Sequence, residues 1–221
     1  MMNPKSLLLA AAALVLAGRA AAKAPAGAAV TQRERAAIHL SLAGILSDQG
    51  MNDEAEAEYR NALAIDPGFI LPRFLLADFF ARRRRVEEAV EQMRAVLKTD
   101  PGHVEARFDL GRFLYESRKY EEALTELRGV LAVRPEAVAV HDIIGNILFD
   151  SGRLAEAEQS YQKALSYNPS FAPAHNDLGN CYLQQGKVAE ARREFVRALE
   201  LNPDLALARR NLENLDRGMG R

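Results

Sequence analysis

The sequence predicts an all-α protein, an α-solenoid of five helical hairpins followed by a C-terminal capping helix. Prolines recur every 34 residues, at Pro67, Pro101, Pro135, Pro169 and Pro203. Two more columns repeat with the same period, one of alanines and one of small residues that each follow an apolar residue. One period shared by three columns indicates stacked copies of a single supersecondary unit.

The N-terminal segment differs from the rest of the chain. Lys5 precedes an apolar run from Leu7 to Ala17, and small residues follow at Ala20 to Ala22. This layout is typical of an export signal, and the run is shorter than the about 20 residues of a membrane-spanning helix. We expect residues 1–22 to be a signal peptide, with an uncleaved membrane anchor as the alternative. Residues 23–35 are expected to form a linker and the start of the first helix.

The two small-residue columns predict how each hairpin packs. The alanine column holds Ala55, Ala89, Ala123, Ala157 and Ala191. The second column holds Ala43, Ala77, Gly111, Gly145 and Gly179. Antiparallel helices approach closely only where the facing side chains are small. Each unit is therefore expected to pair helix A, which carries the second column, with helix B, which carries the alanines.

The turn between helix A and helix B has its own signal. Gly50, Gly152 and Gly186 occupy the same position in three of the units, where a positive φ is expected. Arg84 and Arg118 hold that position in the other two, at a cost of about 1 kcal/mol each if the residue is left-handed.

Both ends of the array are expected to be closed, because each repeat buries its open face against a neighbour. Thr31 and Glu34 predict a capping box at the first helix. Beyond the fifth unit, Leu212 keeps the apolar column, but Glu213 puts a charge in the small-residue column. Residues 206–221 are therefore expected to form a capping helix and a tail.

The last unit carries the residues of a known repeat, namely His175, Leu178, Gly179, Tyr182, Ala191, Phe195, Ala198 and Pro203. In these positions the chain resembles the tetratricopeptide repeat (TPR), with the family's leading Trp replaced. The resemblance covers Ala36 to Leu205 and gives the repeats 36–69, 70–103, 104–137, 138–171 and 172–205. With the export signal, it indicates a TPR protein of the exported bacterial type.

Composition and motifs argue against several function classes. Lys and Arg (29) nearly balance Asp and Glu (30), so no overall charge favours nucleic acid. No phosphate-binding loop, metalloprotease signature or nucleophile elbow occurs, and the repeats leave no room for a catalytic domain. We expect no enzymatic activity, no cofactor, no metal and no nucleic-acid partner. A membrane partner is expected only if the N-terminal segment stays uncleaved, and the oligomeric state is open.

Three further features have alternative interpretations. His39, His141 and His175 occupy the column of the family's Trp, and packing is favoured over a metal site because they lie on separate hairpins. Cys181, the single cysteine, is expected to be a buried thiol. The run from Arg82 to Arg85 is expected to be a solvated turn, with an anion site as the alternative.

The resemblance implies that the A helices line a concave ligand groove. The candidate groove residues are Leu71, Phe74, Asp78, Phe108, Arg112, Tyr115, Asp142, Asn146, Phe149, Asn176, Asn180, Arg210 and Asn214. Three of these asparagines, Asn146, Asn180 and Asn214, are again 34 residues apart. A row of amides can pair with the backbone of an extended peptide. The alternative is that the asparagines pair only with neighbouring helices.

These observations predict a non-enzymatic scaffold or adaptor, exported to the periplasm of the bacterial cell envelope. Its expected partner is a protein or an extended peptide held in the groove. The alternative function is a carrier or sensor of an envelope polysaccharide, in which the aromatic rings and amides would contact sugar.

Overall fold

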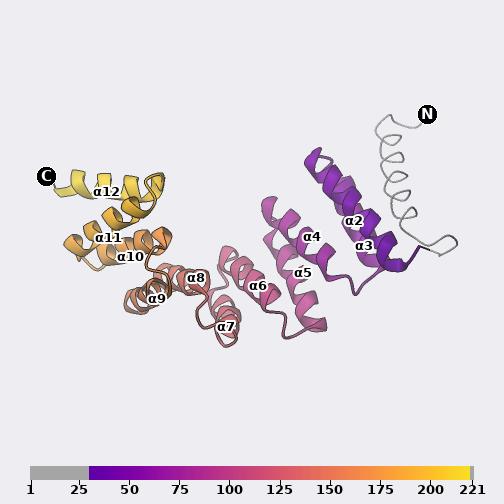
Figure 1. Ribbon diagram of the computed structural model, residues 1–221, viewed down its shortest axis with the longest axis horizontal. Helices are drawn as coiled ribbons and strands as arrows, with labels where there is room; N and C mark the ends of the chain where they lie inside the picture. Colours follow the sequence, from indigo (N-terminus) through magenta and orange to yellow (C-terminus); the bar gives the residue numbers. More distant parts are fainter. Residues whose placement is uncertain (1–29, 220–221) are drawn as a thin grey trace. The chain divides into compact units, whose positions relative to one another are not determined.

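The computed structural model describes residues 30–219, which fold into helices joined by short loops (Figure 1). The helices are α2 (Gln32–Asp48), α3 (Asn52–Ile65), α4 (Ile70–Arg82), α5 (Val86–Thr99), α6 (Val104–Glu116), α7 (Tyr120–Leu131), α8 (Val138–Asp150), α9 (Leu154–Tyr167), α10 (Ala172–Gln184), α11 (Val188–Leu201) and α12 (Ala206–Met219). Helices α2, α4, α6, α8 and α10 are the A helices, and the helix after each is its B helix. Residues 30–219 contain no strand, and the predicted all-α class is confirmed. The predicted signal peptide, residues 1–22, lies outside the described residues.

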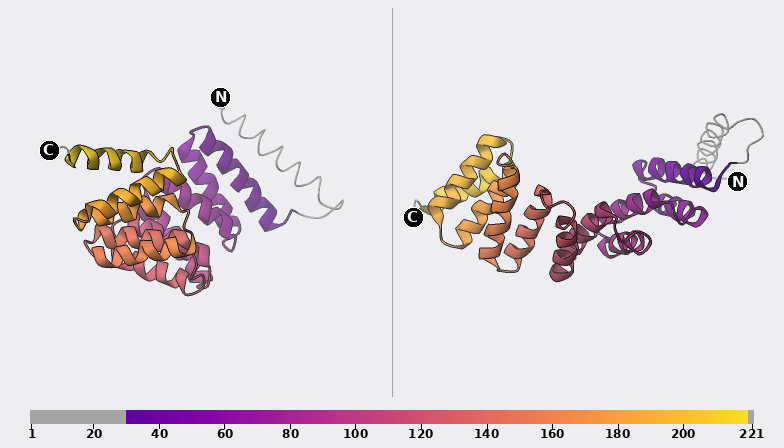
Figure 2. Two further views of the ribbon diagram at one scale, coloured as in Figure 1. Left: turned by 60° about the vertical axis from the view of Figure 1, so that its left-hand side comes forward. Right: turned by 60° about the horizontal axis from the view of Figure 1, so that its bottom comes forward.

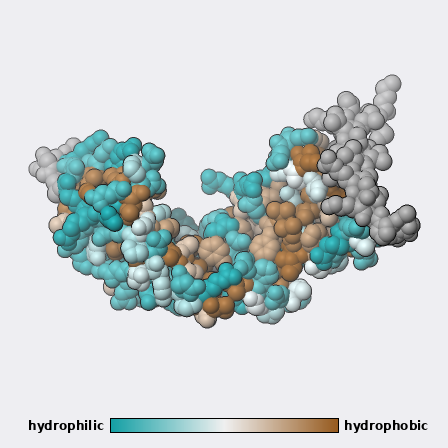
Figure 3. Space-filling model, in the orientation of Figure 1, coloured by the Kyte–Doolittle hydropathy of each residue, from teal (hydrophilic) through white to brown (hydrophobic). Residues whose placement is uncertain are grey.

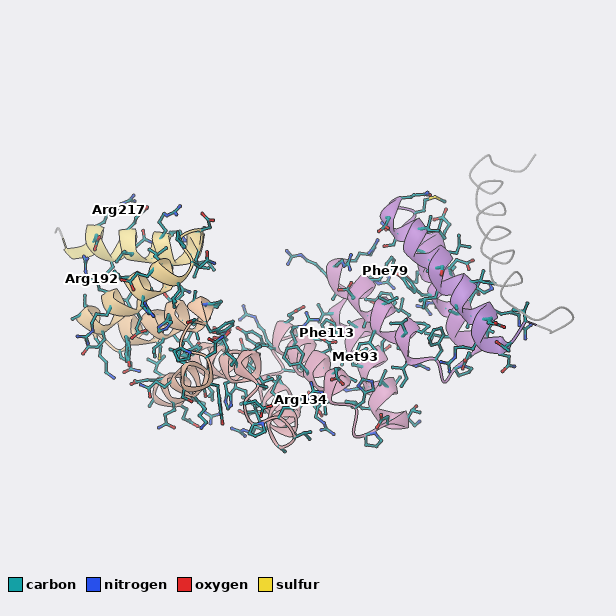
Figure 4. All side chains as sticks on the ribbon, in the orientation of Figure 1. Phe79, Met93, Phe113, Arg134, Arg192 and Arg217 are labelled. Atoms are coloured by element: carbon teal, nitrogen blue, oxygen red, sulfur yellow. The ribbon has the colours of Figure 1, made fainter. Side chains whose placement is uncertain are left out.

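The chain divides into two compact units between Ala106 and Arg107. Unit 1 contains the hairpins α2–α3 and α4–α5. Unit 2 contains α7, the two hairpins α8–α9 and α10–α11, α12, and α6 from Arg107 onward (Figures 1 and 2). Each unit has its own apolar core, with Phe79 and Met93 buried in unit 1 and Phe113 buried in unit 2 (Figure 4).

The small-residue columns lie at the contact between the two helices of each hairpin, as predicted. All five alanines of the B helices have no exposed surface. The glycines of the A helices face bulky side chains of the B helices, because a β-carbon added at Gly145 would overlap Tyr161 and one added at Gly179 would overlap Phe195. The small residues that recur every 34 positions therefore mark where helix A closely approaches helix B.

The Gly145→Ala substitution is expected to destabilise unit 2 by about 2 kcal/mol, from about 3 for overpacking less about 1 for better helix propensity. The new β-carbon would come closer than 3.0 Å to the ring of Tyr161, which is only 1% exposed. That ring has nowhere to move, because its hydroxyl is bound to Asn146. Urea unfolding followed by circular dichroism measures the change.

Gly44→Ala in α2 is the matched control, since a β-carbon there meets nothing within 4 Å. It is expected to stabilise the chain by up to about 1 kcal/mol. Equal tolerance of both substitutions would contradict the close contact between α8 and α9.

The turns between helix A and helix B contain the predicted left-handed residues. Gly50, Gly152 and Gly186 have φ values of 73°, 74° and 76°. Arg84 and Arg118 adopt the same conformation, with φ values of 60° and 58°. The left-handed region costs a residue with a β-carbon about 1–2 kcal/mol, so two of the five turns are strained by their sequence.

The two ends of the array close in different ways. At the first helix, the Thr31 backbone N–H donates to Glu34 Oε2 (2.8 Å) and the Glu34 N–H donates to Thr31 Oγ1 (3.2 Å), which confirms the predicted capping box. At the other end, Leu215 of α12 packs on Ala191 and Phe195 of α11. Arg192 of α11, labelled in Figure 4, forms an ion pair with α12 through Asp216. Glu213 of α12 is exposed.

Candidate functional site

The residues at the positions where the family has Trp join helix A to helix B within a hairpin. His39 Nδ1 lies 2.5 Å from Glu58 Oε2, and His175 Nδ1 lies 2.6 Å from Glu194 Oε2. An arginine does the same in α6, where Arg107 Nη1 donates to an oxygen of the α7 carboxylate (3.0 Å). The histidines thus make structural contacts between helices. Within residues 30–219, no three His, Cys, Asp or Glu side chains are grouped to hold a metal ion.

Three of the four arginines from 82 to 85 are engaged within unit 1, and Arg84 is exposed. Arg82 pairs with Asp78 of its own helix, and Arg83 stacks over Phe79 with 3.6 Å from its guanidinium carbon to the ring centroid. Arg85 Nη1 pairs with Glu56 Oε2 at 2.5 Å. These partners anchor the turn to the helices beside it.

Cys181 of α10 has no exposed surface, and its Sγ donates to the Leu154 carbonyl oxygen (3.3 Å). Burial raises the pKa of this thiol. It is the buried thiol that the sequence predicted. The site favours the protonated thiol over the thiolate.

Polar side chains on the A helices of unit 2 bind one another from helix to helix. Tyr115 OH of α6 donates to Asp150 Oδ2 of α8 (3.0 Å). Asn146 of α8 hydrogen-bonds to the carboxylate of Asp177 of α10. Asn211 of α12 extends the connection, because its Nδ2 donates to two side-chain oxygens of α10 at 2.9 and 3.0 Å. We call this group the A-face network; its members are Tyr115, Asp142, Asn146, Asp150, Tyr161, Asn176, Asp177, Asn180 and Asn211.

Tyr161 supports the network from the B helix below it. Its hydroxyl donates to Asn146 Oδ1 (2.7 Å), and burial raises the pKa of this phenol. Asn176 is only 4% exposed and uses both ends of its amide, since Nδ2 donates to Asp177 Oδ1 (2.9 Å) and Oδ1 accepts from Asn211. The amides of the network are thereby held in fixed orientations.

Asp142 of α8 stands apart from these satisfied groups. The residue is 8% exposed, and its Oδ1 is buried without a hydrogen-bond partner among the described residues. Burial, with a smaller contribution from the nearby Asp177 carboxylate, raises the pKa of Asp142 to about 7. Burial also raises the pKa of Asp177, although hydrogen bonds from Asn176 and Asn146 oppose the change.

The network also offers unused donors. Asn180 Oδ1 accepts from Asn211, but Asn180 Nδ2 has no partner among the residues that the structure describes. The residue is partly exposed, as is Phe149 on the neighbouring α8. A free amide donor and an aromatic ring are therefore presented by two A helices that contact each other.

The predicted groove residues of unit 2 fall into three groups. Tyr115, Asp142, Asn146, Asn176 and Asn180 belong to the A-face network. Arg112 bonds on its own helix to Asp109 (3.2 Å) and Glu116 (3.1 Å), and Phe108 and Phe149 are partly exposed. Arg210 and Asn214 of α12 are exposed and belong to none of the network's hydrogen bonds.

The remaining groove candidates lie in unit 1. Phe74 packs on His103 with ring centroids 5.3 Å apart, and Asp78 is paired with Arg82. Leu71 is 49% exposed, and hydrophobic surface shows over the helices of unit 1 in Figure 3. Asp78 also lines a cavity of about 90 Å³ between α2 and α4, together with Tyr59 and Leu75. This cavity is too small for more than a short side chain.

Four members of the network escaped the sequence analysis. Asp177 and Asn211 are themselves 34 residues apart. They occupy the column next to that of Asp142, Asn176 and Arg210, so the period could have revealed them. Tyr161 comes from the B helix α9, outside the A-helix columns, and Asp150 is the last residue of its helix. None of the helices of residues 30–219 has both the length and the apolarity needed to span a membrane.

Comparisons with known proteins agree with this architecture. Family models described as tetratricopeptide repeat match residues 36–69, 81–147 and 148–212. No curated protein matches the chain. Similar solved structures include MamA from residue 41 to its end, from Desulfovibrio magneticus RS-1, with 21% identity, a TM-score of 0.70 and coverage of 80% of this chain and 99% of that one.

Two further structures are similar at the same level of identity. TTC0263, a thermophilic TPR protein of Thermus thermophilus, has 21% identity, a TM-score of 0.62 and coverage of 81% of this chain and 98% of that one. YrrB, described as a TPR protein with an unusual peptide-binding site, has 21% identity, a TM-score of 0.62 and coverage of 78% of this chain and 89% of that one. At this identity the likeness shows a shared fold.

Proposed function

Because the chain belongs to the tetratricopeptide repeat family, we propose that it is a non-enzymatic scaffold that holds an extended peptide segment of a protein partner against the A-face network. The observation that carries this proposal is the incomplete pairing of that network. Asn180 Nδ2 lacks an acceptor and Asp142 Oδ1 lacks a donor among the described residues, whereas the amides around them are satisfied. Asn180 is partly exposed, so a ligand can supply the acceptor that its Nδ2 lacks, whereas Asp142 Oδ1 lies beneath the surface.

An extended peptide has the right chemistry for these groups. Its backbone carries carbonyl oxygens that can accept from the Asn180 amide and N–H groups that can donate to a side-chain oxygen. Phe149 is near enough along α8 to add apolar contact, since it lies three residues from Asn146 on the same helix. The fold supports this role, because stacked hairpins present long surfaces to a partner. The peptide-binding site in the description of YrrB is in line with the same use of the fold.

We further propose that the protein acts as an adaptor in the bacterial cell envelope, where the signal-like segment at residues 1–22 would deliver it. The absence of an overall positive charge and of nucleotide-binding motifs fits a protein partner better than a nucleic acid.

Photocrosslinking in cells tests the proposal. The photoreactive residue p-benzoylphenylalanine replaces Phe149 on α8, where it keeps the aromatic ring and leaves every hydrogen bond of the network in place. Tyr167, which is 40% exposed on the B helix α9, is the matched aromatic control. We expect a protein product from position 149 that position 167 does not give, recovered from the periplasmic fraction.

The captured segment is then synthesised and titrated against the purified chain. Asn180→Ala is expected to weaken the binding of this peptide about tenfold. A tenfold change corresponds to the net free energy of about one hydrogen bond. Equal products from both positions would contradict the A-face site, and a saccharide product would favour the polysaccharide alternative. Recovery of the chain with the cytoplasm would contradict export.

A further inference from the structure

The hairpin α8–α9 lacks a polar contact that the other hairpins make. In those hairpins a side chain of helix A binds the residue 19 positions later on helix B, and the pairs are His39 with Glu58, Arg73 with Gln92, Arg107 with Glu126, and His175 with Glu194. In α8–α9 the same positions hold His141 and Ser160. The Ser160 hydroxyl donates instead to the Glu156 carbonyl oxygen of its own helix (3.0 Å). Here the histidine therefore has no carboxylate opposite it.

His141 keeps the rest of the pattern. Its Nε2 lies 2.8 Å from the Pro135 carbonyl oxygen, as Nε2 of His175 lies 3.0 Å from that of Pro169. Tyr167 stacks on the His141 ring, with centroids 5.6 Å apart. The ring is thus held in place from two sides, and its Nδ1 has no hydrogen-bond partner within residues 30–219.

A cavity of about 340 Å³ lies at this position, between α7, α8 and α9 of unit 2. His141 and Ser160 both line it, and Leu131, Ile144 and Leu148 give it an apolar surface. The volume is within the range of about 300–1,000 Å³ that is common for ligand sites. The residues of α8 that line the cavity differ from those of the A-face network, so the cavity is a separate surface.

Two cations line the cavity without an acidic partner of their own. Arg128 and Lys163 form no ion pair with any described residue, and Lys163 Nζ lies 4.7 Å from the centroid of the Tyr167 ring. Glu156 is the acid among the lining residues, but its Oε2 pairs with Arg153 Nη2 at 2.6 Å. This hydrogen bond, with a smaller contribution from Arg128, lowers the pKa of Glu156. The cavity therefore has positive charge to spare for a ligand.

The two cations are particular to this place in the array. At the corresponding pairs of positions, the chain has Arg60 with Ala95, Arg94 with Gly129, and Gln162 with Arg197. Each of those pairs contains one cation, whereas Arg128 and Lys163 provide two. The second cation thus occurs in the hairpin that lacks the carboxylate.

We propose that this cavity binds the carboxylate of a glutamate side chain from a partner protein, which takes the place of the missing helix-B residue beside His141. The contacts of Glu58 and Glu194 show that a glutamate carboxylate suits Nδ1 of a histidine in this column. Arg128 and Lys163 supply two further charged donors to the same group. A neutral group would leave those charges unused, and the apolar surface suits an aliphatic neighbour of the glutamate.

The protonation of His141 gives the proposal a pH signature. A carbonyl oxygen only accepts, so Nε2 carries a proton, and a carboxylate at Nδ1 requires the doubly protonated ring. The other charged and titratable groups around the ring are Arg128 from α7 and Glu156, Lys163 and Tyr167 from α9. Among these residue types, histidine is the one that ordinarily changes charge between pH 6 and pH 8. Binding is therefore expected to be tighter at pH 6 than at pH 8.

The test uses a phage-displayed library of random dodecapeptides and the full chain. The library is first depleted on the Ser160→Glu variant and then selected on the unsubstituted chain at pH 6. Ser160→Glu places the chain's own carboxylate beside His141, so it fills the site while leaving the A-face network intact. Ser170→Glu is the matched control, because it makes the same change at an exposed residue outside the cavity. A double variant, Arg128→Gln with Lys163→Gln, removes both cations without filling the cavity.

We expect the selected peptides to carry glutamate at one fixed register beside an apolar residue. Their affinity should fall at least tenfold for Ser160→Glu and for the double variant, and should fall from pH 6 to pH 8. Ser170→Glu and Asn180→Ala should bind them as the unsubstituted chain does. The inference is wrong if no peptide remains after depletion, if the selected peptides lack an acidic residue, or if their affinity is the same at both pH values.

Discussion

At pH 8 the Asp142→Asn variant is expected to be more stable than the unsubstituted chain, by up to about 4 kcal/mol. The pKa of Asp142 is raised from 3.8 to about 7 in the folded protein. A folded-state pKa above the unfolded value means that the folded state holds its proton more tightly. The stability that this provides is present below about pH 4 and is lost progressively as the pH rises to about 7. Asparagine keeps the shape without the charge, so it avoids this loss.

Urea unfolding of both proteins at pH 5 and pH 8, followed by circular dichroism, checks the expectation. The advantage of the variant should grow by roughly 2–3 kcal/mol between the two pH values. Asp204→Asn provides the control, since substitution of an exposed residue away from special features changes stability by about 0.5 kcal/mol or less. A variant that is less stable than the parent at pH 8 would mean that an unrecognised partner stabilises the Asp142 carboxylate.

The Phe195→Ala substitution is expected to destabilise unit 2 by about 3–5 kcal/mol. Phe195 has no exposed surface, lies against Gly179 of α10, and packs with Ala191 of its own helix and Leu215 of α12. Its removal opens a cavity bordered by Gly179 and Ala191, whose small side chains cannot fill it. The substitution therefore weakens two helix contacts, that of α10 with α11 and that of α11 with α12.

Hydrogen exchange measured by mass spectrometry shows where that loss falls. Amides of α11 and α12 are expected to exchange faster in Phe195→Ala, while those of α2 and α3 in unit 1 are unchanged. Val196→Ala is the matched control, because Val196 is the next residue on α11 and is 36% exposed. Similar effects of the two substitutions would show that the ring is not the centre of the contact.

The sequence was sufficient to predict the hairpins, because their packing depends on contacts that recur within each repeat. Gly145 and Tyr161 belong to one hairpin, and the same spacing recurs in Gly179 and Phe195. Even the two strained turns at Arg84 and Arg118 could be predicted, since their column position alone required a left-handed residue.

The candidate site was harder to predict, because it is built between repeats and departs from the period. Asn146 and Asn180 were found in their column, but what each binds depends on how adjacent hairpins are set against one another. Asn180 is bound by Asn211 from α12, and Asn146 is bound by the hydroxyl of Tyr161. The importance of Asp142 lies in the lack of a partner among the described residues, which a sequence cannot reveal without the neighbouring helices.

The charge at Glu213 bears on self-association. A hairpin array is open in principle, because each unit ends in a surface that fits the beginning of the next. Where such a surface stays uncovered, copies of a protein can add head to tail without a closing symmetry and grow into filaments. Leu215 of α12 covers the apolar contact of α11, while Glu213 puts an exposed carboxylate where another helix would need a small side chain. This helix therefore opposes fibre growth from that end at the cost of a single charged residue.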